Sequence, residues 1–113
     1  TADWGAIHAD DEFAKGTPIG RRMFHGTFGL ALAVGMSATL LHFTKPVIAA
    51  LGVREWSYRA PLFVGDTVHL RMTIVEKRVT SSGNRGIVAR RLELVKQDGT
   101  VAQDGFADVM VAV

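Results

Sequence analysis

The longest uncharged stretch of the chain lies between Arg22 and Lys45, and apolar side chains dominate it. Its 22 residues are just enough for a helix to cross a bilayer core of about 30 Å. Histidines, hydroxyl side chains and glycines interrupt the stretch, which argues against a membrane span. A helix that is apolar on nearly every side is also what a surrounding sheet would bury. We therefore predict a buried central helix over residues 26–42 and no membrane partner.

After this helix, apolar and polar side chains alternate with the two-residue period of a β-strand. In the clearest run, Val68, Leu70 and Met72 share one face, with polar side chains between them. The alternation predicts four strands, over residues 53–59, 66–74, 87–95 and 101–113. One long helix followed by an antiparallel meander is typical of an α+β fold.

The segments between these elements carry turn and cap residues. Residues 81–84 and the Asp98-Gly99 pair predict two hairpins, and residues 44–52 are interpreted as a connection. Near the amino end, residues 9–16 begin with acidic side chains and close with Lys-Gly, which predicts a short helix. With 113 residues, 48% of them hydrophobic, the chain is expected to form one domain over residues 1–113.

The net charge of the chain carries little functional information. Thirteen Lys and Arg against eleven Asp and Glu give a net charge of only +2. Nucleic-acid-binding domains usually interleave basic and aromatic side chains, and no aromatic residue separates the late basic residues of this chain. We therefore predict no nucleic-acid partner. We interpret the late basic cluster as a solvated sheet face, formed by Lys77, Arg78, Arg85, Arg90, Arg91 and Lys96.

Cysteine is absent, which excludes a disulfide framework, a thiolate metal site and a cysteine nucleophile. A cytoplasmic location is the simplest interpretation of a chain without cysteine. The four histidines show no ligand spacing on a common face, so we predict no metal and no cofactor. These four are His8, His25, His42 and His69.

Two segments near the amino end carry residues that can move protons or stabilise charge. Asp3 and His8 can converge on one water molecule if the segment between them bends. His25-Gly26 lies where the central helix begins, and the free N–H groups of a helix amino end can stabilise an oxyanion. Surface decoration and a tight start to the helix are the structural alternatives, and the spacing alone leaves them open.

Several segments occur in an order that one family shares: residues 3–8 (DWGAIH), 10–14 (DDEFA), 24–27 (FHGT) and 61–68 (PLFVGDTV). Together they resemble the MaoC-like, (R)-specific enoyl-CoA hydratases. The family signature runs Gly-Asp-x-Asn-Pro-x-His, then an acidic helix, then a His-Gly that opens the central helix. The match follows nearly the whole chain, with Gly5-Ala6 in place of the Asn-Pro.

The resemblance implies a hotdog fold, in which an antiparallel sheet wraps around one central helix. It also implies that Asp3 and His8 activate water, while the Gly26 amide holds the thioester carbonyl in an oxyanion hole. His25 and Trp4 are the candidate substrate contacts. The implied reaction adds water reversibly across a trans-2-enoyl thioester, carried by coenzyme A or an acyl-carrier protein. The implied assembly is a homodimer or a larger homo-oligomer.

Two other functions stay open at this point. Several families of hotdog thioesterases carry an acidic base or nucleophile on the central helix, and residues 26–42 contain no Asp or Glu. A non-catalytic acyl-binding hotdog domain is the other alternative, since the Asn-Pro of the signature is missing. Family members also carry about 20–30 residues, with a first strand, before the Asp, so we expect such a segment upstream of Thr1.

Overall fold

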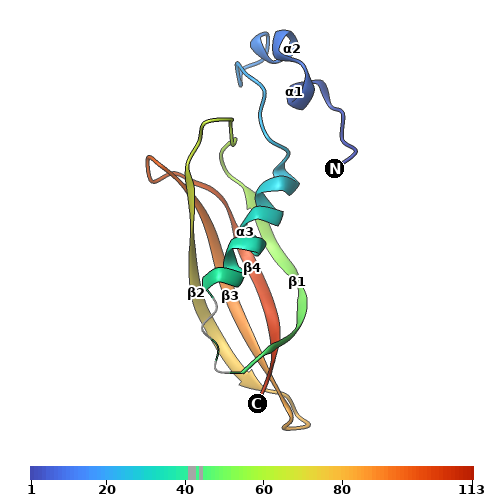
Figure 1. Cartoon of the computed structure of the whole chain (residues 1–113), viewed down its shortest axis with the longest axis vertical. Coiled ribbons are helices and arrows are strands. Elements are labelled where there is room, and N and C mark those ends of the chain that lie inside the picture. Colours follow the sequence, from blue (N-terminus) through green and yellow to red (C-terminus); the bar gives the residue numbers. More distant parts are fainter. Residues whose placement is uncertain (41–42, 44) are drawn as a thin grey trace.

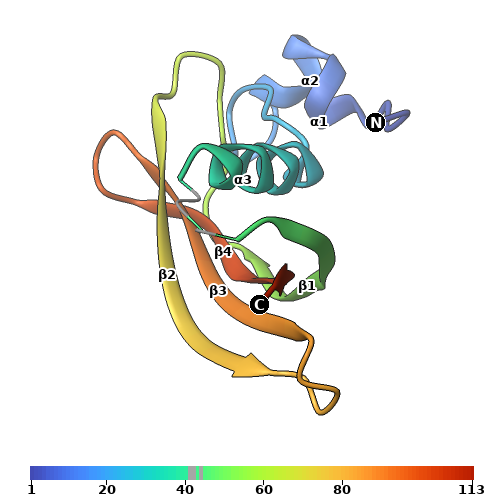
Figure 2. The ribbon, with the colours of Figure 1, turned by 60° about the horizontal axis from the view of Figure 1, so that its bottom comes forward.

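The computed structural model describes residues 1–40, 43 and 45–113 of the chain. Its centre is a four-stranded antiparallel sheet with the strand order β1-β4-β3-β2, and helix α3 lies across one face (Figure 1). The sheet curls about α3, as Figure 2 shows, while the amino-terminal segment lies beyond the start of that helix. The predicted α+β class is confirmed.

Helix α3 spans Gly26–Leu40 and packs small residues against the sheet. Its buried residues are Gly29, Ala33 and Ser37, which recur every four positions and therefore form one narrow stripe. Small side chains on this stripe let the helix approach the sheet closely. The predicted end of the helix, at residue 42, lies outside the described residues. Within the described part of the chain, no helix combines the length and apolar character needed to cross a membrane.

Two short helices replace the single helix predicted over residues 9–16. Helix α1 spans Ala6–Ala9, helix α2 spans Asp11–Lys15, and Asp10 separates them in an extended conformation. The Asp10 carboxylate accepts two N–H groups from the first turn of α2, at 3.0 and 3.1 Å. Because this cap satisfies the free donors of the helix end, it sets the start of α2 later than predicted.

Strand β1 spans Val47–Tyr58, so the connection predicted over residues 44–52 is wrong from residue 47 onward. The first residues of β1 already pair with β4. Register shifts interrupt this ladder close to Gly52, with φ +132°, and to Glu55, with φ +53°. Such bulges break the two-residue alternation, and for this reason the sequence pattern did not reveal the first half of the strand.

The remaining strands are β2 (Val68–Val79), β3 (Arg85–Lys96) and β4 (Val101–Ala112). Both predicted hairpins are present, and their turns place Gly83 and Gly99 at φ +75° and +85°. Glycine adopts these positive φ values without the steric cost that other residues pay. Strand β2 continues beyond its predicted end through a register shift after Ile74.

The core lies between α3 and the sheet and is centred on Leu92 and Leu94 of β3, which are fully buried. Arg90 shares this face of the sheet and is only 3% exposed. Its Nε donates to the Ala107 carbonyl at 2.7 Å, and one terminal nitrogen donates to Ser37 Oγ at 3.3 Å. The predicted solvated face is therefore wrong for Arg90, because strand alternation points it toward α3.

Asp66 ties the loop before β2 to the end of β3. Its carboxylate accepts the Phe63 N–H at 2.8 Å and the Gln97 side-chain amide at 2.9 Å, and pairs with the Lys96 ammonium at 2.9 Å. These contacts, led by the Gln97 amide, lower the pKa of Asp66 to about 2. Lys96 is thus a second basic residue that is mostly buried in the fold, against the prediction of a solvated face.

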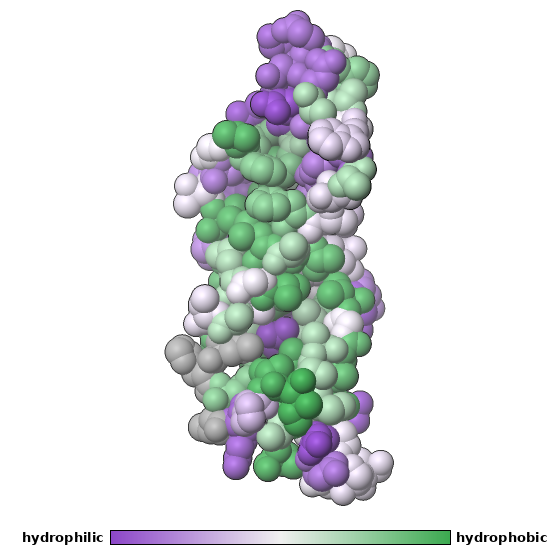
Figure 3. Space-filling view, turned by 45° about the vertical axis from the view of Figure 1, so that its right-hand side comes forward, coloured by the Kyte–Doolittle hydropathy of each residue, from purple (hydrophilic) through white to green (hydrophobic). Residues whose placement is uncertain are grey.

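Apolar side chains remain exposed along α3 and β1. Each is 38–46% exposed, and the set comprises Phe28, Val34, Leu40, Val47, Ile48, Leu51 and Val53. Figure 3 shows that apolar residues cover the middle of one face of the molecule. Extended apolar patches on a soluble domain usually mark a contact surface.

Candidate active site

Backbone contacts hold the amino-terminal segment against the start of α3. Met23 donates its N–H to the Ile7 carbonyl at 3.2 Å, and Phe24 donates to the Leu62 carbonyl at 2.8 Å. The His8 side chain adds a third contact, since its Nδ1 lies 2.8 Å from the Met23 carbonyl oxygen. The fold therefore brings α1 and its histidine to the amino end of α3.

Asp3 and His8 face each other across a short gap. Asp3 Oδ2 and His8 Nε2 lie 3.6 Å apart, which is too long for a direct hydrogen bond. A carbonyl oxygen only accepts, so Nδ1 of His8 is the donor to Met23, and in the neutral form of the ring Nε2 then carries the lone pair that faces the carboxylate. Two acceptors at this distance suit one water molecule that donates a hydrogen bond to each.

Gly5 orients both members of this pair through its backbone. Its N–H donates to Asp3 Oδ1 at 2.9 Å, and its carbonyl accepts the His8 N–H at 2.9 Å. The Gly5 N–H is the main cause that lowers the pKa of Asp3, with smaller contributions from His8 and His25. Asp3 is therefore ionised at neutral pH. The backbone groups of Gly5 thus hold this loop in place.

His25 contacts the pair from the side of α3. Its Nε2 lies 2.8 Å from the Asp3 carbonyl oxygen, and its ring stacks on His8 with centroids 4.0 Å apart. His25 also lines the adjoining cleft. Trp4 is 84% exposed and lines a neighbouring surface hollow, which Asp3, His8 and His25 also line. The structure thus gathers Asp3, His8 and His25; Asp3 and His25 line the cleft as well as the hollow, whereas His8 and Trp4 line the hollow and not the cleft.

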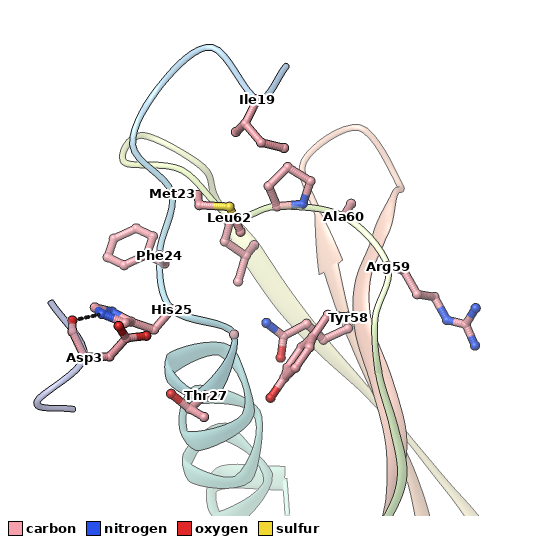
Figure 4. Close-up of a pocket in the computed structure, with 13 residues that line it drawn as sticks. Asp3, Ile19, Met23, Phe24, His25, Thr27, Tyr58, Arg59, Ala60 and Leu62 are labelled. Atoms are coloured by element: carbon pink, nitrogen blue, oxygen red, sulfur yellow. Dashed lines mark hydrogen bonds between the residues drawn. The ribbon is translucent and has the colours of Figure 1, made fainter. Parts of the chain in front are cut away.

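A cleft of about 350 Å³ opens beside this pair at the amino end of α3. Figure 4 shows Asp3 and His25 on one side of the helix start and Tyr58 on the other. Gly26 lies between them, and a Cβ at this position would come within 2.8 Å of the Tyr58 ring. The N–H groups of this first turn have no preceding helical carbonyl to bind. The cleft therefore joins a carboxylate, a histidine and a free helix end in one space.

An apolar hollow of about 280 Å³ adjoins the cleft and shares Phe24 and Leu62 with it. Its other walls include Phe28, Leu32 and Phe63. Apolar hollows of this kind, next to a few convergent polar groups, are typical of small-molecule sites.

Two cleft residues, Tyr58 and Gln103, were not predicted from the sequence. They stand opposite each other on β1 and β4, and Gln103 is only 3% exposed. The strand that holds Gln103 also carries Asp104 and Asp108, so its sequence gave no signal that separates Gln103 from the other polar residues. Their proximity depends on the pairing of β1 with β4, which alternation along one strand does not reveal.

Asp3, His8 and His25 each offer one metal-ligand atom, and these atoms lie within 4.8 Å of one another. The prediction that the histidines share no common face is therefore wrong for His8 and His25. Within the described residues, His69 lies exposed on β2, while His42 is outside them. The His25 Nε2 is already engaged with the Asp3 carbonyl. The absence of a metal and of a cofactor stays a prediction.

Solved structures share this architecture. A monoamine oxidase regulatory protein from Archaeoglobus superposes with a TM-score of 0.89 at 29% identity, over 98% of this chain and 74% of that one. The (R)-hydratase of A. caviae gives 0.75 at 26% identity, over 95% and 76%. A Mycobacterium tuberculosis protein with a double hotdog fold gives 0.76 at 20% identity, over 95% and 33%. The predicted hotdog fold is confirmed.

Residues 1–96 match the family described as MaoC like domain, and the chain belongs to this family. A 3-hydroxybutyryl-CoA dehydratase of Methylorubrum extorquens is 30% identical over 77 residues, which cover 67% of this chain and 46% of that protein. A mesaconyl-CoA hydratase of Cereibacter sphaeroides is 29% identical over 112 residues, or 94% of this chain and 30% of that protein. The chain thus spans less than half the length of these relatives.

Proposed function

We propose that the chain forms the site of a hydratase that adds water reversibly across a trans-2-enoyl thioester. The observation that carries this proposal is the Asp3–His8 pair, 3.6 Å apart beside the amino end of α3. The names of the two relatives, a dehydratase and a hydratase of coenzyme A thioesters, support coenzyme A as the carrier. An acyl-carrier protein is the alternative carrier of the same thioester.

In this mechanism one water lies between Asp3 Oδ2 and His8 Nε2 and donates a hydrogen bond to each. As the water oxygen bonds to C3, Nε2 takes one of its protons, and the adjacent carboxylate stabilises the imidazolium that forms. The imidazolium then delivers a proton to C2. The product is a 3-hydroxyacyl thioester, which has gained one water molecule, and the reverse sequence removes it.

The negative charge that develops on the thioester oxygen would be stabilised by the Gly26 N–H. This group belongs to the first turn of a 15-residue helix, so it has no intrahelical acceptor and lies at the positive end of the helix dipole. The Tyr58 ring lies against Gly26, and Asp3 lies on the other side of the helix start. We propose that the acyl chain crosses the cleft and that its far end occupies the apolar hollow that adjoins it.

We also propose that a second copy of the chain covers the exposed apolar side chains of α3 and β1. Their exposure would be costly in an isolated domain of 12.2 kDa. Sedimentation velocity at micromolar concentration is then expected to show a dimer or larger species. A predominant monomer would contradict this assembly.

The test of the proposed function is the purified chain with crotonyl-CoA. Hydration removes the conjugated thioester, so its absorbance falls while no free thiol is released. Release of the coenzyme A thiol without hydration would show that the chain is a thioesterase. Binding of the thioester with neither reaction would assign a non-catalytic acyl-binding domain.

A further inference from the structure

Gln103 of β4 is the most buried polar side chain of the cleft, with 3% of its surface exposed. Its Oε1 accepts the indole N–H of Trp56 at 3.0 Å. Trp56 belongs to β1 and packs tightly there, since a Cβ at Gly105 would lie 2.8 Å from the Trp56 Cα. The Gln103 amide is therefore held in one position by a neighbouring strand.

The indole of Trp56 also fixes which way the amide faces. An indole nitrogen only donates, so the oxygen of Gln103 has to point toward Trp56 and the NH2 group away from it. The amide lies directly against Gly29 of α3, where a Cβ would overlap it. The two donor hydrogens are thus presented under the first turns of α3.

Among the described residues, Trp56 is the one hydrogen-bond partner of the Gln103 side chain, and it uses only the oxygen. The neighbours of Gln103 on the core side are apolar, including Leu94 across the β3–β4 ladder and Leu92. In the part of the chain that the structure describes, the one fully buried side-chain atom without a partner is Asp108 Oδ1, so the Gln103 NH2 group is not sealed off from the cleft that Gln103 lines. An oriented NH2 group without a protein acceptor, in a residue that lines the cleft, can donate a hydrogen bond to an acceptor on the ligand.

The Gln103 amide lies beside Gly29 of α3, and this position relative to Gly26 indicates which part of the ligand the amide meets. Gly26 and Gly29 lie three residues apart on the same face of the helix, which is about 4.5 Å along its axis. If the thioester oxygen binds at the Gly26 N–H, the Gln103 amide lies farther in, near the carbons that follow the double bond.

We propose, on the basis of the hydratase function above, that Gln103 selects enoyl thioesters whose acyl group carries an oxygen acceptor. The acceptor is a carboxylate, carbonyl or hydroxyl oxygen attached at the carbon after the double bond. Gln103 donates a hydrogen bond to this oxygen, and Trp56 keeps the donor oriented. Gln103 is a specificity residue in this account and takes no part in proton transfer.

The experiment compares three coenzyme A thioesters that differ at one position: crotonyl-CoA, 4-hydroxycrotonyl-CoA and fumaryl-CoA. The unmodified chain is expected to hydrate at least one oxygen-bearing substrate with a kcat/KM about tenfold or more above that of crotonyl-CoA. Whichever substrate is preferred identifies the acceptor.

Gln103→Met keeps the length of the side chain but removes the donor, and Gln103→Glu keeps an acceptor for Trp56 while also removing the NH2 group. Both variants are expected to lose the preference by about tenfold, because kcat/KM falls more for the oxygen-bearing substrates than for crotonyl-CoA. Gln97→Met is the matched control, because it removes a hydrogen-bonded Gln outside the cleft and should keep the preference. An equal fall for all three substrates, or no change, overturns the proposal.

Binding separates this proposal from the hydratase function. The dissociation constants of butyryl-CoA, 4-hydroxybutyryl-CoA and succinyl-CoA, measured by calorimetry, report the same preference without any reaction. If the Gln103-dependent preference appears in binding while no hydration occurs, the hydratase function fails and the selection by Gln103 stands. If binding shows no preference that depends on Gln103, the selection fails whatever the activity.

Discussion

The amino-terminal segment and the sheet of this protein are built by different means. In the segment, α1 has no buried residue and α2 has one, Ala14, and capping and backbone hydrogen bonds define its path. The sheet and α3 enclose a core in which Leu92 and Leu94 are fully buried. The proposed proton-transfer groups thus lie on the thinly packed part, and the helix end that would hold the thioester lies on the packed part.

This contrast predicts that activity and stability respond to different residues. Removing a side chain from the segment removes hydrogen bonds but little buried apolar surface, so the free energy of unfolding should hardly change. Removing one from the core leaves a cavity and weakens the whole domain, while the groups of the site keep their positions in the molecules that stay folded.

The largest effect is expected at the Asp3–His8 pair. Asp3→Asn and His8→Ala should each lower the turnover number for crotonyl-CoA by about 100-fold or more, because each removes a positioned proton-transfer group. The denaturation midpoint should stay close to that of the unmodified chain. Initial rates and urea denaturation of the same preparations check both parts, and a large loss of stability would contradict the contrast.

A variant in the core is expected to show the opposite pattern, a loss of stability with little change in activity. Leu92→Ala is expected to lower the free energy of unfolding by about 3 kcal/mol, from lost burial and the cavity left under α3. The turnover number per folded molecule should be nearly unchanged under native conditions. Urea denaturation measures the free energy of unfolding. Titration of the active sites with a tightly binding thioester counts the folded molecules, so that the turnover number can be given per folded molecule. A full loss of activity in the folded variant would show that the site depends on this packing.

An intermediate effect concerns the acid stability of the sheet. Asp66 has a folded pKa of about 2, below the ordinary value of 3.8, so its stabilisation is present above that value and is lost as the pH falls toward 2. Asp66→Asn should therefore lower the free energy of unfolding by about 2 kcal/mol near neutral pH and flatten the loss in acid. Urea denaturation across this pH range measures both effects. If the free energy of unfolding of Asp66→Asn fell as steeply in acid as that of the unmodified chain, other carboxylates would cause the loss of stability.

The smallest effect is expected at His25, which acts through its contacts with Asp3 and His8. His25→Ala should lower the turnover number by roughly tenfold, because the stacked ring and the Asp3 carbonyl lose their support. In a His8→Ala background the same change should have almost no further effect on turnover. His69→Ala, on the exposed face of β2, is the control and should leave the rate unchanged.

The sequence pattern predicted the parts of the fold in which a local rule holds. The first half of β2 alternates up to the register shift after Ile74, and the hairpin glycines mark the turns on either side of β3, so these elements could be placed. The first half of β1 could not, because the bulges near Gly52 and Glu55 shift its side chains out of the two-residue period. The division of the first helix depends on the Asp10 cap, which the acidic run around it conceals.

The site divides in the same way. Asp3 and His8 belong to one short motif, and Gly26 opens a long apolar helix; the spacing alone left their roles open, and the resemblance to the MaoC-like hydratases made them candidates. Tyr58 and Gln103 are 45 residues apart and meet only because β1 pairs with β4 in one register. Arg90 is buried for an equally non-local reason, since the face that it shares with Leu92 is covered by α3.

The most direct test of the central claim is the double variant Asp3→Asn/His8→Ala, assayed for crotonyl-CoA hydration beside its two single variants. If both residues act on the same water, the double variant retains about the same residual rate as the slower single variant. The far-UV spectrum and the dissociation constant of the thioester should match those of the unmodified chain. Multiplicative losses, or full hydration by a folded Asp3→Asn chain, would contradict the account.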